Sequence, residues 1–187
     1  MRTTGGLIHR DLAARNVLVS SYTPAAAGQP GAIAVQLTDY GLARDVRMLR
    51  GGVYVTPEGS DVAMPKLWIP PESLQSRQFT RASDVRLTSL CFFCEDPSAM
   101  NAASAQVWAF GVTLWEIMTD GNLLYYMWAC SDDELVRRVV AGEVMPRPDD
   151  CTPPLYALMV SCWKYAPTER PDFSHVEAQV ADVKLSL

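Results

Sequence analysis

A polar stretch at residues 9–16, His-Arg-Asp-Leu-Ala-Ala-Arg-Asn, is the feature that most constrains this chain. It runs into a short β-rich segment at 17–19, and a second β-rich segment at 33–37 ends just before Asp39. Two β-rich runs separated by turn residues favour a hairpin. The hairpin would bring Asn16 and Asp39, with their amide and carboxylate oxygens, together at its ends. The sequence therefore predicts an oxygen-rich site at one end of a hairpin.

The link between the two β-rich segments, Ser20 to Ala32, is longer than a hairpin needs. It contains two prolines and two glycines among alanines, and these residues punctuate loops. We therefore expect a solvated loop over Ser20 to Ala32 and assign no function to it.

The polar stretch and the triplet Asp39-Tyr40-Gly41 together resemble the catalytic loop and metal-binding turn of protein kinases. The interior Ala13-Ala14-Arg15 narrows the resemblance to receptor-like protein-tyrosine kinases. Residues 65–72, Pro-Lys-Leu-Trp-Ile-Pro-Pro-Glu, resemble the end of a tyrosine-kinase activation segment. Further matches are Ser83-Asp84, residues 107–116, Cys162-Trp163 and residues 170–173.

The resemblance implies transfer of the γ-phosphoryl group of ATP to a protein tyrosine hydroxyl, with ATP and Mg²⁺ as cofactors. Asp11 would accept the proton of the substrate hydroxyl. Asn16 and Asp39 would hold Mg²⁺, and Asp39 would hold the ions that bridge the phosphates of ATP. Arg15 would contact the substrate phenol or its phosphate, and Pro65 would form a platform for the tyrosine ring.

The resemblance also implies structural and regulatory roles. Glu72 and Arg170 would form a structural ion pair beneath the active site, and Asp84 would hydrogen-bond the backbone of the catalytic loop. Tyr54 is the only tyrosine between the Asp-Tyr-Gly triplet and Glu72, which makes it the candidate autophosphorylation site. Its phosphate could dock on Arg10 and order the segment. The alternative is an exposed loop tyrosine with no role.

The implied fold is α+β and protein kinase-like, a mainly helical carboxy-terminal lobe with a short β-hairpin. Within one partial kinase domain, 1–187, we assign residues 7–19 to the catalytic loop and its strand, 39–72 to the activation segment and 107–187 to the helical part.

Four helices are expected after the activation segment. Residues 107–118 are apolar nearly all round, which suits a helix buried at the centre of a domain. Ser131 and Glu134 have capping-box spacing, and Gly142 is a stop signal for the helix that follows them. Thr152-Pro153 opens another helix, and residues 174–185 form the last one.

Some family elements are missing from the 187 residues. No Gly-rich phosphate loop, strand lysine or partner glutamate precedes His9, and neither does the helix that normally precedes the catalytic loop. The nucleotide-binding amino-terminal lobe is therefore absent, and we expect the isolated chain to be inactive and poorly stable. The alternative is a noncatalytic, pseudokinase-like fragment that acts as a protein-interaction module. The presence of Asp11, Asn16 and Asp39 favours a kinase for the parent protein.

Residues 85–106 interrupt the resemblance. Asp84-Val85 and Val107-Trp108 look like two halves of one Asp-Val-Trp motif. A valine codon begins with GT and a glutamine codon can end in AG, which are the usual intron boundaries. We interpret 85–106 as a retained intron, with a genuine loop insertion as the rival. The insertion either detaches Asp84 from the central helix or puts Gln106 in its register.

Composition restricts the partners. The formal net charge of −5 argues against a nucleic-acid surface, so the expected partners are protein substrates. The longest apolar stretch, around Trp108 to Met118, is too short to span a bilayer. We therefore expect a cytoplasmic protein, or the cytoplasmic portion of a membrane receptor.

Cys91 and Cys94 lack the second pair that a zinc site needs, and all five cysteines are expected to be reduced thiols.

Overall fold

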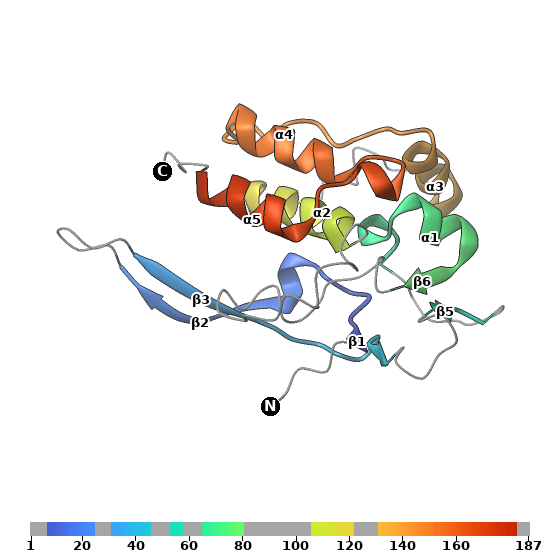
Figure 1. Ribbon diagram of the computed structural model, residues 1–187, viewed down its shortest axis with the longest axis horizontal. Coiled ribbons are helices and arrows are strands. Elements are labelled where there is room, and N and C mark those ends of the chain that lie inside the picture. Colours follow the sequence, from blue (N-terminus) through green and yellow to red (C-terminus); the bar gives the residue numbers. More distant parts are fainter. Residues whose placement is uncertain are drawn as a thin grey trace.

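The computed structural model describes residues 7–24, 31–45, 53–57, 65–80, 106–121 and 131–182. These ranges form helices and small antiparallel sheets, which confirms the predicted α+β class. The helices gather on one side of the molecule and the hairpin β2–β3 extends from the other side (Figure 1). None of the described helices has the length and apolar character needed to cross a membrane. The helices are α1 Pro71–Ser76, α2 Gln106–Met118, α3 Asp132–Val140, α4 Pro153–Cys162 and α5 Phe173–Asp182.

The strands pair two by two. β1 (Leu7–Ile8) pairs with β4 (Arg44–Asp45), β2 (Val17–Thr23) with β3 (Ala32–Leu37), and β5 (Val53–Val55) with β6 (Gln78–Thr80). Single turns of 3₁₀ helix lie at η1 Ala14–Asn16, η3 Lys66–Trp68 and η7 Pro167–Glu169.

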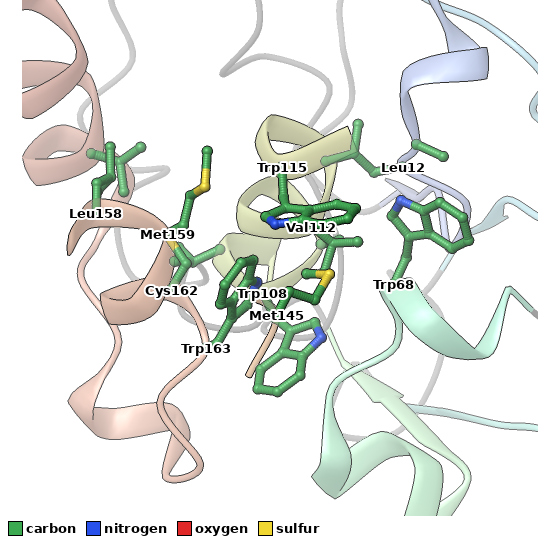
Figure 2. Close-up of a cluster of buried hydrophobic side chains, with 14 of the residues drawn as sticks. Leu12, Trp68, Trp108, Val112, Trp115, Met145, Leu158, Met159, Cys162 and Trp163 are labelled. Atoms are coloured by element: carbon green, nitrogen blue, oxygen red, sulfur yellow. The ribbon is translucent and has the colours of Figure 1, made fainter. Parts of the chain in front are cut away.

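Helix α2 is the centre of the core, as its apolar sequence predicts. Val107, Val112 and Trp115 are at most 2% exposed. Side chains of α4 pack on one side of α2, and Leu12 and Trp68 pack on the other (Figure 2). A Cβ atom at Gly111 would lie 2.8 Å from the Cβ of Cys162, so only glycine permits this close approach of the two helices.

The ends of the other helices follow their capping signals. Ser131 is the N-cap of α3, and its hydroxyl accepts the backbone N–H of Glu134 at 3.3 Å. Gly142 follows α3 with a φ of +82°, a conformation that glycine adopts without steric cost. Thr152 occupies the N-cap position of α4, as predicted. Helix α5 begins at Phe173, one residue earlier than predicted, and residues 183–185 lie outside the described part of the chain.

The hairpin is longer than the sequence predicted. The expectation of a loop over Ser20 to Ala32 is wrong at both ends, because β2 continues to Thr23 and β3 begins at Ala32. Tyr22 pairs with Ile33, and Thr23 pairs with Ala32. Tyrosine, threonine and isoleucine favour strands, and this preference outweighs the loop signals that flank them. Residues 25–30 of the link lie outside the described part.

A β-bulge between Val19 and Ser21 keeps apolar side chains on one face of the hairpin. Residues directly opposite each other share a face, and the extra residue shifts β2 by one position. The pairs Val19–Val35 and Tyr22–Ile33 therefore lie on the same face. Val19, Tyr22 and Ile33 are 62% to 66% exposed. An apolar stripe consequently runs from the buried base of the hairpin out to its exposed end.

The predicted ion pair between Glu72 and Arg170 is present. Arg170 follows η7 and donates from Nη1 and Nη2 to the two carboxylate oxygens of Glu72, in the first turn of α1, at 2.8 Å each. The same guanidinium also donates to the carbonyls of Lys164 and Tyr165 and lies 5.2 Å from the ring centroid of Trp108. The Arg170 side chain is fully buried and that of Glu72 is 33% exposed. This pair joins α1 to the segment between α4 and α5.

Replacing Glu72 with Gln should destabilise the fold, because it leaves the Arg170 charge buried without its carboxylate. We expect the free energy of unfolding to fall by roughly 2 to 3 kcal/mol, below the usual cost for a fully buried pair because Glu72 is partly exposed. Urea denaturation checks this value. Glu134→Gln removes a carboxylate whose two arginine partners reach solvent, at 73% and 34% exposed, and serves as the control. Equal losses for the two variants would contradict the role of the Glu72–Arg170 pair.

Candidate active site

The imidazole of His9 ties the polar stretch to the strand before Asp39. Its Nε2 bonds the carbonyl oxygen of Thr38 at 2.9 Å, and its Nδ1 faces the backbone N–H of Asp11 at 3.3 Å. A carbonyl can only accept, so the proton must sit on Nε2, and Nδ1 accepts from Asp11. Burial lowers the pKa of His9, which keeps the ring neutral at pH 7. A neutral His9 therefore bridges two segments of the site.

Asp11 is held by two side chains of its own loop. Asn16 Nδ2 donates to the Asp11 side-chain oxygen Oδ2 at 2.9 Å and to its backbone carbonyl at 2.7 Å. Arg15 donates from Nη2 to Oδ1 of the same carboxylate. The structure thus brings together the three residues predicted to be catalytic. Because the amide nitrogen of Asn16 faces Asp11, its amide oxygen is the atom left to face a cation.

The end of the activation segment lies against this loop. The guanidinium carbon of Arg15 lies 4.8 Å from the ring centroid of Trp68, close enough for a cation–π contact. Trp68 ends η3, and its backbone N–H donates to the carbonyl of Pro65 at 3.0 Å. Pro65 is half-buried. The predicted substrate residues Arg15 and Pro65 are therefore linked through Trp68.

Asp39 is exposed and begins a turn after β3. Its φ is +59°, and its Oδ1 accepts the backbone N–H of Gly41 at 3.1 Å. The backbone N–H of Thr38 donates to the carbonyl of Asn16 at 2.8 Å, so the two predicted metal ligands come from backbone segments that are directly joined. Among the described residues, no three His, Cys, Asp or Glu side chains form a metal-binding group.

Tyr40 places an aromatic ring and a hydroxyl in the turn. The ring lies edge-on to His9 with the centroids 5.1 Å apart. The hydroxyl donates to the carbonyl of Leu37 at 3.1 Å. The hydroxyl of Tyr40 therefore has a hydrogen-bond acceptor at the end of β3, the strand that leads into the turn.

Glu116 is a site residue that the sequence analysis missed. It lies on α2, is 5% exposed, and its Oε2 accepts the backbone N–H of Ala14 at 2.7 Å. The sequence contained one signal for this role, a single acidic residue in an otherwise apolar helix. A carboxylate buried in such a helix needs a hydrogen-bond donor from another part of the chain. Glu116 fastens the catalytic loop to the central helix. Asp84, which was predicted to hold that backbone, lies outside the described residues.

Arg10 and Tyr54 lie together, as the regulatory prediction requires. The guanidinium carbon of Arg10 is 4.6 Å from the ring centroid of Tyr54, and that of Arg44 is 5.6 Å from it. Arg10 Nε also donates to the carbonyl of Leu42 at 2.8 Å. Tyr54 pairs with Phe79 between β5 and β6. Two arginines therefore flank the candidate phosphorylation site.

Two cysteines in the described residues are free thiols, as predicted. Burial raises the pKa of Cys162 to about 12, and burial also raises the pKa of Cys151. Thiols of this kind stay protonated at neutral pH and are poor nucleophiles. Cys91, Cys94 and Cys130 lie outside the described residues.

Comparison with known proteins agrees with the motifs and the geometry. The sequence model of the family described as protein tyrosine and serine/threonine kinase matches residues 3–91 and 97–180. Ephrin type-A receptor 7 of Gallus gallus is 32% identical over 171 residues, which cover 91% of this chain and 14% of the receptor. This likeness agrees with the receptor-like tyrosine-kinase resemblance of the catalytic loop. Because the family match covers most of its length, the chain belongs to the protein tyrosine and serine/threonine kinase family.

Proposed function

We propose that this chain is the carboxy-terminal lobe of a protein-tyrosine kinase that transfers the γ-phosphoryl group of ATP to a protein tyrosine hydroxyl. The observation that carries the proposal is the arrangement around Asp11, whose carboxylate is held by Arg15 and Asn16 within one short loop. Phosphoryl transfer requires little covalent chemistry from the protein, so catalysis depends on positioning and charge. A carboxylate fixed in this way suits a residue that orients a hydroxyl and accepts its proton.

Arg15 and Pro65 would determine which substrate side chain binds. The Arg15 guanidinium lies between Asp11 and the Trp68 ring, where it can meet a phenol oxygen or the phosphate that forms on it. Pro65 lies at the start of the same turn as Trp68, and its flat ring suits an aromatic substrate side chain. This surface favours a protein tyrosine over a serine.

The side-chain oxygens present fit Mg²⁺ and ATP. Mg²⁺ is usually held by one or two carboxylates together with substrate phosphates, rather than by a cage of protein ligands. The Asn16 amide oxygen and the Asp39 carboxylate would supply such a set. When bound, the ion would neutralise the charge that develops on the phosphates.

The 187 residues contain no Gly-rich phosphate loop or strand lysine, so other residues must complete the nucleotide site. We therefore expect the isolated chain to be inactive. Residues 85–106 would be an insertion in this lobe, and the break in the family match at 92–96 falls within them. In the parent protein, the lobe would act on the cytoplasmic side of a membrane receptor or in a cytoplasmic enzyme.

The second candidate function is a noncatalytic interaction module. The exposed apolar stripe of the hairpin, which includes Val19, Tyr22 and Ile33, favours it. Exposed apolar patches of this kind often mark protein contacts. Retention of both a catalytic carboxylate and an oxygen-rich turn favours the kinase.

Activity tests the proposed function directly. The isolated chain should form no phosphotyrosine on a glutamate–tyrosine copolymer, and Mg-ATP should not raise its melting temperature. Joined to the amino-terminal lobe of a related kinase, the chain should transfer phosphate, and Asp11→Asn should lower kcat about 10² to 10⁴-fold. His175→Gln, on the exposed face of α5, is the control. An active Asp11→Asn chimera would exclude Asp11 as the base.

Glu116 should affect catalysis through the loop it fastens. Glu116→Gln keeps the shape but weakens the hydrogen bond from Ala14, because a neutral amide oxygen is a poorer acceptor than a carboxylate. In the chimera, we expect kcat to fall about tenfold while KM for ATP stays unchanged, since the lost free energy is about 1.4 kcal/mol. Ser161→Ala removes a hydroxyl of α4 that donates to the carbonyl of Leu158 at 2.7 Å, and it is the control. A change in KM alone would contradict the positioning role.

Phosphorylation of Tyr54 should stabilise the fold, because the phosphate would lie beside the guanidinium groups of Arg10 and Arg44. The chain phosphorylated at Tyr54 by an added tyrosine kinase should melt several degrees higher than the unmodified chain. Arg44→Gln should reduce the increase, and Tyr54→Phe should abolish it. An unchanged melting temperature on phosphorylation would leave Tyr54 without a regulatory role.

A further inference from the structure

Helix α4 and the segment that leads into α5 enclose a groove that contains none of the candidate active-site residues. The two helices contact each other and lie together at the helical side of the molecule (Figure 1). The volume of the groove is about 910 Å³, which is within the range of pockets that bind ligands. The active-site loop instead contacts the helical part through α2. The groove therefore belongs to a different surface.

The lining of the groove combines an apolar floor with an acidic edge. Pro154, Ala157 and Leu158 of α4 provide apolar surface, and Glu169 and Asp172 provide carboxylates. Leu158 is deeply buried, whereas both carboxylates are exposed. An aliphatic side chain could therefore contact the floor while a charged group stays at the edge.

The charge of this edge is not balanced within the described residues. Lys and Arg are absent from the described lining, and no ion pair within the described ranges includes Glu169 or Asp172. Oδ1 of Asp172 accepts the backbone N–H of His175 at 2.8 Å, and the other carboxylate oxygen takes no part in that bond. The groove therefore attracts cations and repels acidic segments.

A polar atom at the end of the groove adds a directional contact. Thr152, at the N-cap of α4, lines the groove, and its side chain makes no capping hydrogen bond. Its Oγ1 is buried and has no hydrogen-bond partner among the described residues. A buried hydroxyl without a partner is costly, and a peptide carbonyl is one group that could satisfy it.

We propose that the groove between α4 and α5 binds a protein segment in which an arginine or lysine stands next to an aliphatic residue. The cation would contact Glu169 and Asp172, the aliphatic side chain would contact Ala157 and Leu158, and a main-chain carbonyl would accept from Thr152. This contact requires no phosphoryl transfer. The surface can therefore recruit a basic partner whether or not the chain is catalytically active.

Fluorescence anisotropy tests the proposal on the full 187-residue chain without ATP. The probe is a fluorescein-labelled hexapeptide of alternating leucine and arginine, and the matched peptide has glutamate in place of arginine. We expect the arginine peptide to bind, more weakly as salt is raised, and the glutamate peptide not to bind. The double variant Glu169→Gln with Asp172→Asn should weaken binding about threefold to tenfold. Asparagine at position 172 still caps α5, so the helix is preserved.

Two further variants test whether the peptide binds in the groove rather than elsewhere on the chain. Ala157→Arg places a bulky cation at an exposed position of α4 and should abolish binding while circular dichroism stays unchanged. Glu177→Gln removes an equal charge from α5 outside the lining and should leave affinity unchanged. Equal binding of both peptides, or binding unaffected by Ala157→Arg, would overturn the proposal. Self-association that Ala157→Arg abolishes would also overturn it, because the groove would then accept a second copy of the chain.

Discussion

Helix α2 is the element around which the rest of the described structure packs, and only Ile117 among its large apolar side chains is exposed. Helix α4 covers one side closely enough to demand glycine at position 111, and the polar loop and η3 cover another. The helix carries a single charged side chain, Glu116, which is 5% exposed. A carboxylate in such surroundings needs a donor, and the backbone N–H of Ala14 provides it. Burial of α2 therefore fixes the loop that carries Asp11.

The same loop is held on its other side by the hairpin. His9 bridges the backbones of Asp11 and Thr38, and the carbonyl of Asn16 accepts from Thr38. The segments before Asp11 and before Asp39 consequently cannot move independently. An enzyme that works by positioning charges gains most from such a scaffold, since small displacements of the reacting groups lower the rate strongly. The apolar core thus provides the precision that phosphoryl transfer requires.

Sequence signals that act locally predicted much of this arrangement. The apolar character of residues 107–118, the cap at Ser131 and the proline after Thr152 each predicted a helix, because capping and burial depend on neighbouring residues. The partnership of Glu72 with Arg170 came from family resemblance, since no local pattern joins residues so far apart.

Other features depend on contacts that a linear pattern does not contain. The bulge in β2 exists because Tyr22 must share a face with Val19, which becomes visible only when the partner strand is in register. Glu116 stands out in an apolar helix, but its donor, the backbone N–H of Ala14, lies 102 residues away in the sequence. The groove between α4 and α5 arises in the same way, from residues on separate elements.

Amide hydrogen exchange at Ala14, followed by NMR, shows whether Glu116 holds the catalytic loop in place. The buried carboxylate of Glu116 accepts this one backbone N–H. Exchange at Ala14 should then be as slow as at the core amides of α2, since both should open only when the core opens. Exchange at the rate of an unprotected loop would contradict the account, because the loop would then move independently of the helix.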